Sequence, residues 1–142
     1  MRRPFLRCLV LPIALALGAG ACSDDPDTTT TPTVPTQVNV TETFTGTITK
    51  NGAVSFPFTA ISAGTATASL TTVGPDAAIP LGISVGVWNG TSCAVAIAND
   101  NALQGYVLTA SINAAGSLCL RVYDAAARVT DVFTFTVEVV HP

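Results

Sequence analysis

The stretch Gly82-Ile83-Ser84-Val85-Gly86 matches the G-x-S-x-G pattern that surrounds the nucleophile of many serine hydrolases. Asp124 or Asp131 and then His141 follow it, in the order nucleophile, acid, base. The mechanism needs a serine on a sharp turn between a strand and a helix, but Ser84 lies within an alternating apolar run that no helical pattern follows. We also expect His141, the second-to-last residue, to be mobile. The sequence therefore predicts no catalytic residues and no enzyme, with a small hydrolase as the alternative.

A second candidate is a cluster of oxygen ligands formed by Asn99-Asp100-Asn101 together with Asp124. Calcium needs six to eight such oxygens, and this set supplies few of them. Asn and Asp are also typical of turns because they tolerate left-handed backbone conformations, and we favour that interpretation. We predict no metal site and no cofactor.

Trp88 and Tyr123 carry the side chains best suited to stacking on a sugar ring. Tyr123 is predicted on the strand face opposite Leu118 and Leu120, so its ring is expected to be exposed. Trp88 flanks the Asn89-Gly90 turn, where it could instead cover the edge of the core. The sequence thus leaves carbohydrate binding by these two residues as an alternative to a structural role.

The N-terminus has the organisation of a targeting segment. Arginines at positions 2, 3 and 7 precede an apolar stretch over 8–21, which is too short for a membrane span but suits a signal peptide. It ends in Ala19-Gly20-Ala21-Cys22, which resembles the lipobox of bacterial lipoproteins, with Ala19 where an aliphatic residue is usual. The resemblance implies cleavage after Ala21 and acylation of Cys22. The start also resembles a twin-arginine signal, and ordinary secretory export stays open beside it.

The segment that follows, 22–40, is rich in Thr and Pro and has little to bury, which predicts a disordered linker. About 18 residues at roughly 3.1 Å each would reach on the order of 55 Å. A domain tethered to a bilayer by its N-terminus needs such a spacer. We therefore divide the chain into a signal peptide over 1–21, a lipid-anchored linker over 22–40 and a folded domain over 41–142.

Of the four cysteines, Cys8 falls in the signal and Cys22 is assigned to lipid. Cys93 and Cys119 remain, both in the folded region of an exported protein, where disulfides persist. We predict that they pair. No histidine lies near either of them in the sequence, which argues against zinc.

The charge balance excludes nucleic acid as a partner. Without the signal, the chain keeps three cations, Lys50, Arg121 and Arg128, against nine carboxylates. Three scattered cations give no basic surface for a phosphate backbone.

From about residue 41 the sequence alternates with the period of two that is typical of half-buried strands, and no stretch has sustained helical spacing. Asn51-Gly52 predicts a hairpin between the first two strands, and Asn89-Gly90 a turn between two later ones. Short strands at this density favour an all-β fold, an antiparallel sandwich. The expected strands cover 41–49, 54–58, 65–73, 81–87, 93–97, 106–112, 117–123 and 132–140.

Gly64 after a strand, the later strand 116–122 and the final 133–137 together resemble the bacterial pre-peptidase C-terminal domain. The resemblance spans roughly residues 43–140. It implies a jelly-roll-like β-sandwich that serves secreted enzymes as a non-catalytic accessory module. The acidic pair common in that family is reduced to Asp76 here, which puts a calcium role in doubt.

The sequence thus predicts a lipoprotein of the bacterial cell envelope, anchored to a membrane and facing the periplasm or the cell surface. Its sandwich is expected to act as a binding or structural module for a glycan or an envelope protein. A carbohydrate-binding module and a small envelope hydrolase are the alternatives. The ligand, the membrane and the oligomeric state are not readable from the sequence.

Overall fold

The computed structural model describes residues 36–142. The predicted signal peptide, the acylated Cys22 and most of the predicted linker lie outside the described residues. Within them the chain is all-β and contains no helix that could span a membrane. Eight strands form: β1 (Val40–Ile48), β2 (Ala53–Ala60), β3 (Gly64–Gly74), β4 (Leu81–Trp88), β5 (Cys93–Ala102), β6 (Val107–Ile112), β7 (Gly116–Tyr123) and β8 (Phe133–His141).

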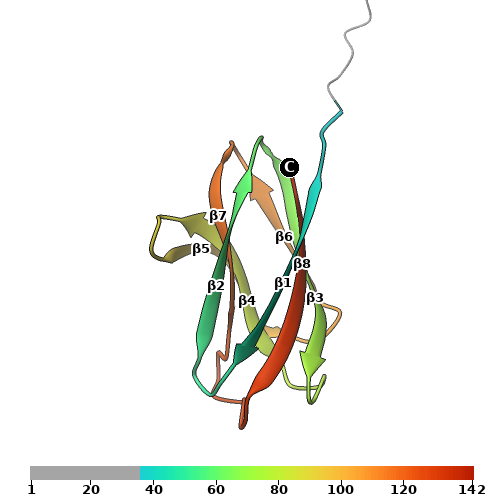
Figure 1. The fold of residues 1–142 in the computed structure, drawn as a ribbon, viewed down its shortest axis with the longest axis vertical. Coiled ribbons are helices and arrows are strands. Elements are labelled where there is room, and N and C mark those ends of the chain that lie inside the picture. The colour runs from blue at the N-terminus through green and yellow to red at the C-terminus, as the bar shows by residue number, and fades with distance from the viewer. Residues whose placement is uncertain (1–35) are drawn as a thin grey trace, which may run out of the picture. The chain divides into compact units, whose positions relative to one another are not determined.

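The strands form two four-stranded antiparallel sheets, which confirms the predicted β-sandwich (Figure 1). One sheet has the order β1-β8-β3-β6 and the other β2-β7-β4-β5. Each strand of the first half therefore pairs with its mirror in the second half: β1 with β8, β2 with β7, β3 with β6 and β4 with β5. The chain is in effect one long hairpin, folded so that successive pairs alternate between sheets. This is the jelly-roll arrangement.

The alternation seen in the sequence is the reason for this core. Along β8 every second residue is buried, and Phe135 and Val137 point at the other sheet. Leu120 and Val122 of β7 meet them from the opposite side. Because the side-chain period of a strand is two, the intervening threonines are left for the outer face.

The Asn51-Gly52 prediction was right about a turn and wrong about a hairpin. Asn51 has φ 57° and the N–H of Gly52 donates to the carbonyl of Thr49 at 2.8 Å, so the chain does reverse here. However, β1 and β2 belong to different sheets. The dipeptide determines a tight reversal but not the pairing of the strands on either side of it. Here β1 pairs with β8, and β2 pairs with β7. Asn89-Gly90, by contrast, does connect a true hairpin, β4–β5.

The strand directions place every loop at one of two ends. The proximal end, where the chain enters from Thr36, comprises residues 36–39, 61–63, 113–115 and Pro142, and the β4–β5 loop, residues 89–92, projects sideways below it (Figure 1). The distal end comprises the connections 49–52, 75–80, 103–106 and 124–132. The two ends are separated by about nine strand residues, or roughly 30 Å.

Candidate functional site

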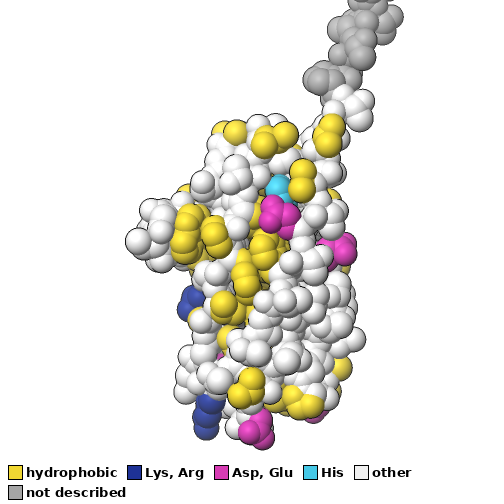
Figure 2. Space-filling model, in the orientation of Figure 1, with side chains coloured by type: hydrophobic (Ala, Val, Ile, Leu, Met, Phe, Trp, Pro, Cys, Tyr) yellow, Lys and Arg dark blue, Asp and Glu magenta, His cyan; other side chains and the backbone are white. Residues whose placement is uncertain are grey.

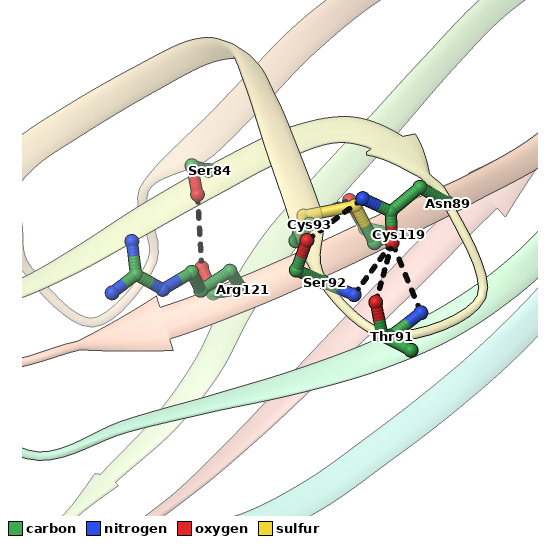
Figure 3. Close-up of a disulfide and its surroundings, with 7 residues drawn as sticks. All are labelled: Ser84, Asn89, Thr91, Ser92, Cys93, Cys119 and Arg121. Carbon is green, nitrogen blue, oxygen red and sulfur yellow. Dashed lines mark hydrogen bonds between the residues drawn. A yellow bond between two sulfur atoms is a disulfide. The ribbon is translucent and has the colours of Figure 1, made fainter.

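The G-x-S-x-G stretch is part of β4, and all three of its small residues have structural reasons. The ring of Tyr123 covers Gly82 so closely that a Cβ at this position would lie 2.6 Å from the ring carbon Cδ2. Only glycine fits there. Gly86 lies under the backbone of β5, where a Cβ would be 2.7 Å from the carbonyl carbon of Ala94. Between them Ser84 is buried, and its hydroxyl donates to the carbonyl oxygen of Arg121 at 3.5 Å (Figure 3). No strand-to-helix turn is present, so this serine is not presented as a nucleophile.

The structure does not bring the hydrolase residues together. Ser84 lies on the outer face of the β2-β7-β4-β5 sheet, whereas His141 packs between the sheets against the Phe58 ring, 4.9 Å between centroids. Asp124 and Asp131 lie at the distal end and His141 at the proximal end. Our expectation that His141 is mobile was wrong. It is the last residue of β8, it is 2% exposed, and its Nε2 lies 3.0 Å from Oε1 of Glu42.

Asp124 holds together two connections at the distal end. Its carboxylate accepts the backbone N–H of Asn51 at 3.1 Å, of Arg128 at 2.9 Å and of Val129 at 3.3 Å. The N–H of Asp124 in turn donates to the carbonyl of Gly52 at 3.0 Å. Burial opposes the charge on this carboxyl, but the backbone N–H groups outweigh it and lower its pKa below the usual range. Both carboxylate oxygens are thus engaged in local structure.

The Asn99–Asn101 stretch does not form the turn that we expected. It continues β5, and the N–H of Asn101 donates to the side-chain oxygen of Asn99 at 2.7 Å. Asn101 and Asp100 each bond a side chain of another segment, Arg128 and Tyr123 respectively. The strand continues because β4 supplies partners as far as Leu81. Within residues 36–142, no group of three or more His, Cys, Asp or Glu could hold a metal ion.

We expected the ring of Tyr123 to be exposed, but it is half-buried and held by its neighbours. Its hydroxyl donates to the carboxylate of Asp100, and the guanidinium of Arg121 lies 4.9 Å from the ring centroid. Burial raises the pKa of Tyr123 to about 12, and the hydrogen bond to Asp100 acts in the same direction. The ring also covers Gly82. Tyr123 therefore has a structural role on the outer face of this sheet.

Trp88 and Tyr123 do not form one stacking platform. Tyr123 pairs with Gly82, at the distal end of β4, whereas Trp88 is the last residue of that strand at the proximal end. Six residues of strand separate them, or roughly 20 Å at about 3.3 Å per residue. Of the two, Trp88 is the one that lines a hollow.

The predicted disulfide between Cys93 and Cys119 is present and braces the β4–β5 hairpin (Figure 3). It ties the first residue of β5, an edge strand, to β7, with which β5 does not pair. The Cα atoms are 5.7 Å apart. Such a close approach is possible because β5 passes over Gly86, which has no side chain.

The loop of this hairpin satisfies its own polar groups. The side-chain oxygen of Asn89 accepts the N–H groups of Thr91 at 3.0 Å and Ser92 at 2.8 Å, and its amide nitrogen donates to the Ser92 hydroxyl at 2.9 Å. Gly90 takes the left-handed conformation, with φ 97°, that the turn requires. The position of Trp88 is therefore fixed from both sides.

Beside Trp88 lies a hollow of about 440 Å³, the proximal pocket. It lies where the β6–β7 loop meets the ends of β4 and β5, and its lining side chains are mostly aliphatic. Val87 and Leu118 pair across the sheet and face it from the inner side. The complete lining consists of residues 85–88, Ala96 and residues 110–118.

A second hollow of about 440 Å³ lies at the same end, lined by residues 36–38 and 61–63. Neither hollow adjoins a charged side chain, because the proximal segments contain no Asp, Glu, Lys, Arg or His. In the view of Figure 2 the upper tip of the domain is yellow and white, with the histidine and an acidic side chain just below it, and dark blue and magenta side chains reach the lower tip. Neither hollow was predicted from the sequence. Val87 and Leu118 offered one signal, since they are inward-facing apolar residues at strand ends, where a sandwich opens.

No protein-family model matches the chain, and a comparison with curated proteins finds no match. The resemblance to the pre-peptidase C-terminal domain therefore stays a prediction.

Proposed function

We propose that this chain is a bacterial lipoprotein, cleaved after Ala21 and acylated on Cys22. Its β-sandwich acts at the cell envelope as a non-catalytic binding or structural module. The N-terminal arginines, the short apolar stretch, the lipobox-like end and the Thr/Pro-rich segment support the anchor. The resemblance to an accessory domain of secreted enzymes supports the module.

Structural roles of the reactive side chains support a non-catalytic module. Ser84 bonds the backbone of the neighbouring strand, Asp124 holds two loops, and His141 pairs with Glu42 inside the sandwich. General acid–base catalysis needs such groups within hydrogen-bonding reach of one substrate. Here they lie on an outer face, at the distal end and at the proximal end.

The observation that carries the binding role is the character of the proximal end. This is the end through which the chain continues toward Cys22, and it holds both hollows and no charged side chain. A concave, mostly apolar site with a tryptophan at its rim is typical of ligand and partner sites. We place the module's contact with the envelope there.

Mass spectrometry of the mature chain purified from its own membranes tests the anchor. The proposal expects a chain that begins at Cys22 and carries acyl groups on that residue. An unmodified chain beginning at Cys22 would leave a secreted protein without an anchor. A serine-directed covalent probe tests the non-catalytic role, and stoichiometric labelling that disappears in Ser84→Ala would contradict it.

A carbohydrate ligand is the second candidate, favoured by the position of Trp88 at the proximal pocket with the polar residues Ser111, Asn113 and Ser117 in the lining. A glycan array of the folded domain would test it. The carbohydrate hypothesis expects hits that Trp88→Ala removes and Tyr123→Phe leaves in place, because only Trp88 lines the pocket. An array without hits would reject it.

A further inference from the structure

We propose that the proximal end is a membrane-docking surface that rests on the bilayer to which the chain is anchored. The inference rests on the proposed acylation of Cys22 and adds an orientation: the sandwich stands on its proximal end, with the distal end away from the lipid. The occupant of this surface is the interfacial region of a phospholipid bilayer.

The proximal end exposes a set of apolar side chains. Val38 and Ile61 are each 69% exposed, and Val87 is 54% exposed beside the proximal pocket. Val40, at the start of β1, adds a fourth. Trp88 is half-buried at the same end, and tryptophan is enriched where a protein surface meets the headgroup region of a bilayer. Peripheral contacts with membranes are built from such apolar protrusions.

The charged side chains of the loops are distributed unevenly between the two ends. The described connections at the distal end carry five charged side chains, and those at the proximal end carry none. The acidic side chain nearest the proximal end is Glu42, whose Oε1 lies 3.0 Å from Nε2 of His141. Bacterial bilayers with anionic lipids repel carboxylates within about 8 Å, the Debye length at physiological salt. With the proximal end down, Asp76, Asp124 and Asp131 stand roughly 30 Å away, a strand length.

The segment between Cys22 and the sandwich is short enough to keep the domain close to the bilayer. Fourteen residue steps separate Cys22 from Thr36, which limits their separation to at most about 50 Å. A tether of this length makes the contact intramolecular, at an effective concentration on the order of millimolar. A surface with only weak affinity for lipid would therefore be occupied once the chain is anchored. The end at which the tether joins is the proximal one.

The test uses Trp88, the single tryptophan of the chain, as a native probe. The purified acylated mature chain is reconstituted into phosphatidylethanolamine–phosphatidylglycerol vesicles, with and without brominated acyl chains, and tryptophan emission is compared. We expect the brominated lipid to quench Trp88. Ile61→Asp, which puts a charge on the docking surface, is expected to reduce the docked-to-free ratio about tenfold and to lose most of the quenching.

Val132→Asp is the matched control, because Val132 is 57% exposed on the distal loop 124–132. It is expected to be quenched like the unsubstituted chain. Val38→Asp should behave like Ile61→Asp, and unchanged thermal melting of all three variants excludes misfolding. Quenching that is absent in the unsubstituted chain, equal in all variants, or lost in Val132→Asp would overturn the inference.

The same samples separate the two proposals. A chain that is acylated but not quenched refutes the docking surface and leaves the anchor intact. A chain without acyl groups refutes the anchor, and with it the docking that depends on it. Unquenched, concentration-dependent dimers would instead identify a second copy of the chain as the occupant of this end.

Discussion

The two ends of the sandwich differ in how their loops are held together. At the distal end, polar side chains close the connections: Asp124 bonds three backbone N–H groups, Arg128 reaches Asn101, and the side-chain oxygen of Gln104 accepts the N–H of Val73 at 3.0 Å. At the proximal end, the uncharged side chain of Asn89 closes the β4–β5 loop, and the Cys93–Cys119 disulfide and the close approach of β5 to Gly86 hold that hairpin in place. That end has two hollows, and its connecting segments carry no charged side chain.

This difference assigns structural roles to the polar groups of the distal end and leaves the proximal end as the contact surface that we propose. The charged side chains that attract attention in the sequence stabilise the distal end. The loops of the proximal end carry no charged side chain and match no catalytic or metal-binding motif. They expose apolar side chains, such as Val38 and Ile61, to solvent. For this fold we therefore look for a contact site where the loops expose apolar side chains and carry no charge, and not where charged side chains gather.

The largest effect is expected from removing the disulfide. Cys93→Ala with Cys119→Ala should lower the free energy of unfolding by about 3–4 kcal/mol, because a closed loop of this length no longer restricts the unfolded chain. Urea unfolding of the double variant measures the loss. Hydrogen exchange of the variant should rise first in the β4–β5 hairpin. An increase that begins at the distal end would contradict the assignment of the brace to the proximal end.

Asp124→Ala tests the distal end in the same way. Three backbone N–H groups lose their acceptor, which is expected to lower the free energy of unfolding by about 2–3 kcal/mol. Urea unfolding measures this change as well, with Asp131→Ala, at an exposed position on the same loop, as the matched control. A loss no greater than that of the control would mean that these bonds do not hold the distal loops.

The pH dependence of stability has a defined sign at this residue. The folded-state pKa of Asp124 is lowered, whereas the unfolded-state value is about 3.9. Its contribution is therefore complete above about pH 4 and is lost as the pH falls toward the folded-state pKa. Asp124→Asn should reduce this acid sensitivity.

Gly86→Ala tests the close approach of β5 over β4. The added methyl group would overlap the backbone of Ala94, so β5 must shift, with an expected cost of about 1–3 kcal/mol. Gly116→Ala is the control within the same sheet, since no atom lies within 4 Å of a Cβ there. Thermal melting compares the two. Equal melting temperatures would show that the hairpin does not depend on this glycine.

The smallest effect is expected at Tyr123. Its phenol should ionise near pH 12, and Asp100→Asn should lower that pKa toward the usual 10, because a neutral amide oxygen replaces the charged carboxylate as the acceptor. Because the folded-state pKa is the higher one, the contribution of Tyr123 is complete below about pH 10 and is lost as the pH rises toward 12. An ultraviolet titration measures the ionisation, with Tyr123→Phe to assign it. An unchanged pKa in Asp100→Asn would mean that burial alone raises it.

Much of the fold could be predicted from the sequence, because strand alternation and turn residues act locally. All eight strands are found, β5 extends further than expected, and the cysteine pair follows from counting thiols. The partners of β1 and β2 could not be predicted, since Asn51-Gly52 specifies a reversal and not a sheet. The buried position of His141 was missed because its pairing with Glu42 joins residues 99 positions apart.

The candidate site was harder to predict for the same physical reason. Trp88 was singled out as an aromatic side chain, but its proximal pocket is assembled from β4, β5, β6 and β7. Tyr123 carried the same signal and turned out to be held by Asp100 and Arg121. A side chain alone does not tell whether its neighbours will cover it.

Hydrogen exchange of the acylated chain, with and without phospholipid vesicles, tests most directly the claim that the two ends have different roles. The account predicts slower exchange on vesicles in residues 61–64, 88–93 and 113–116 of the proximal end. It predicts unchanged exchange in the distal connection 124–132. Protection of the distal connection, or the same exchange at both ends with and without vesicles, would contradict it.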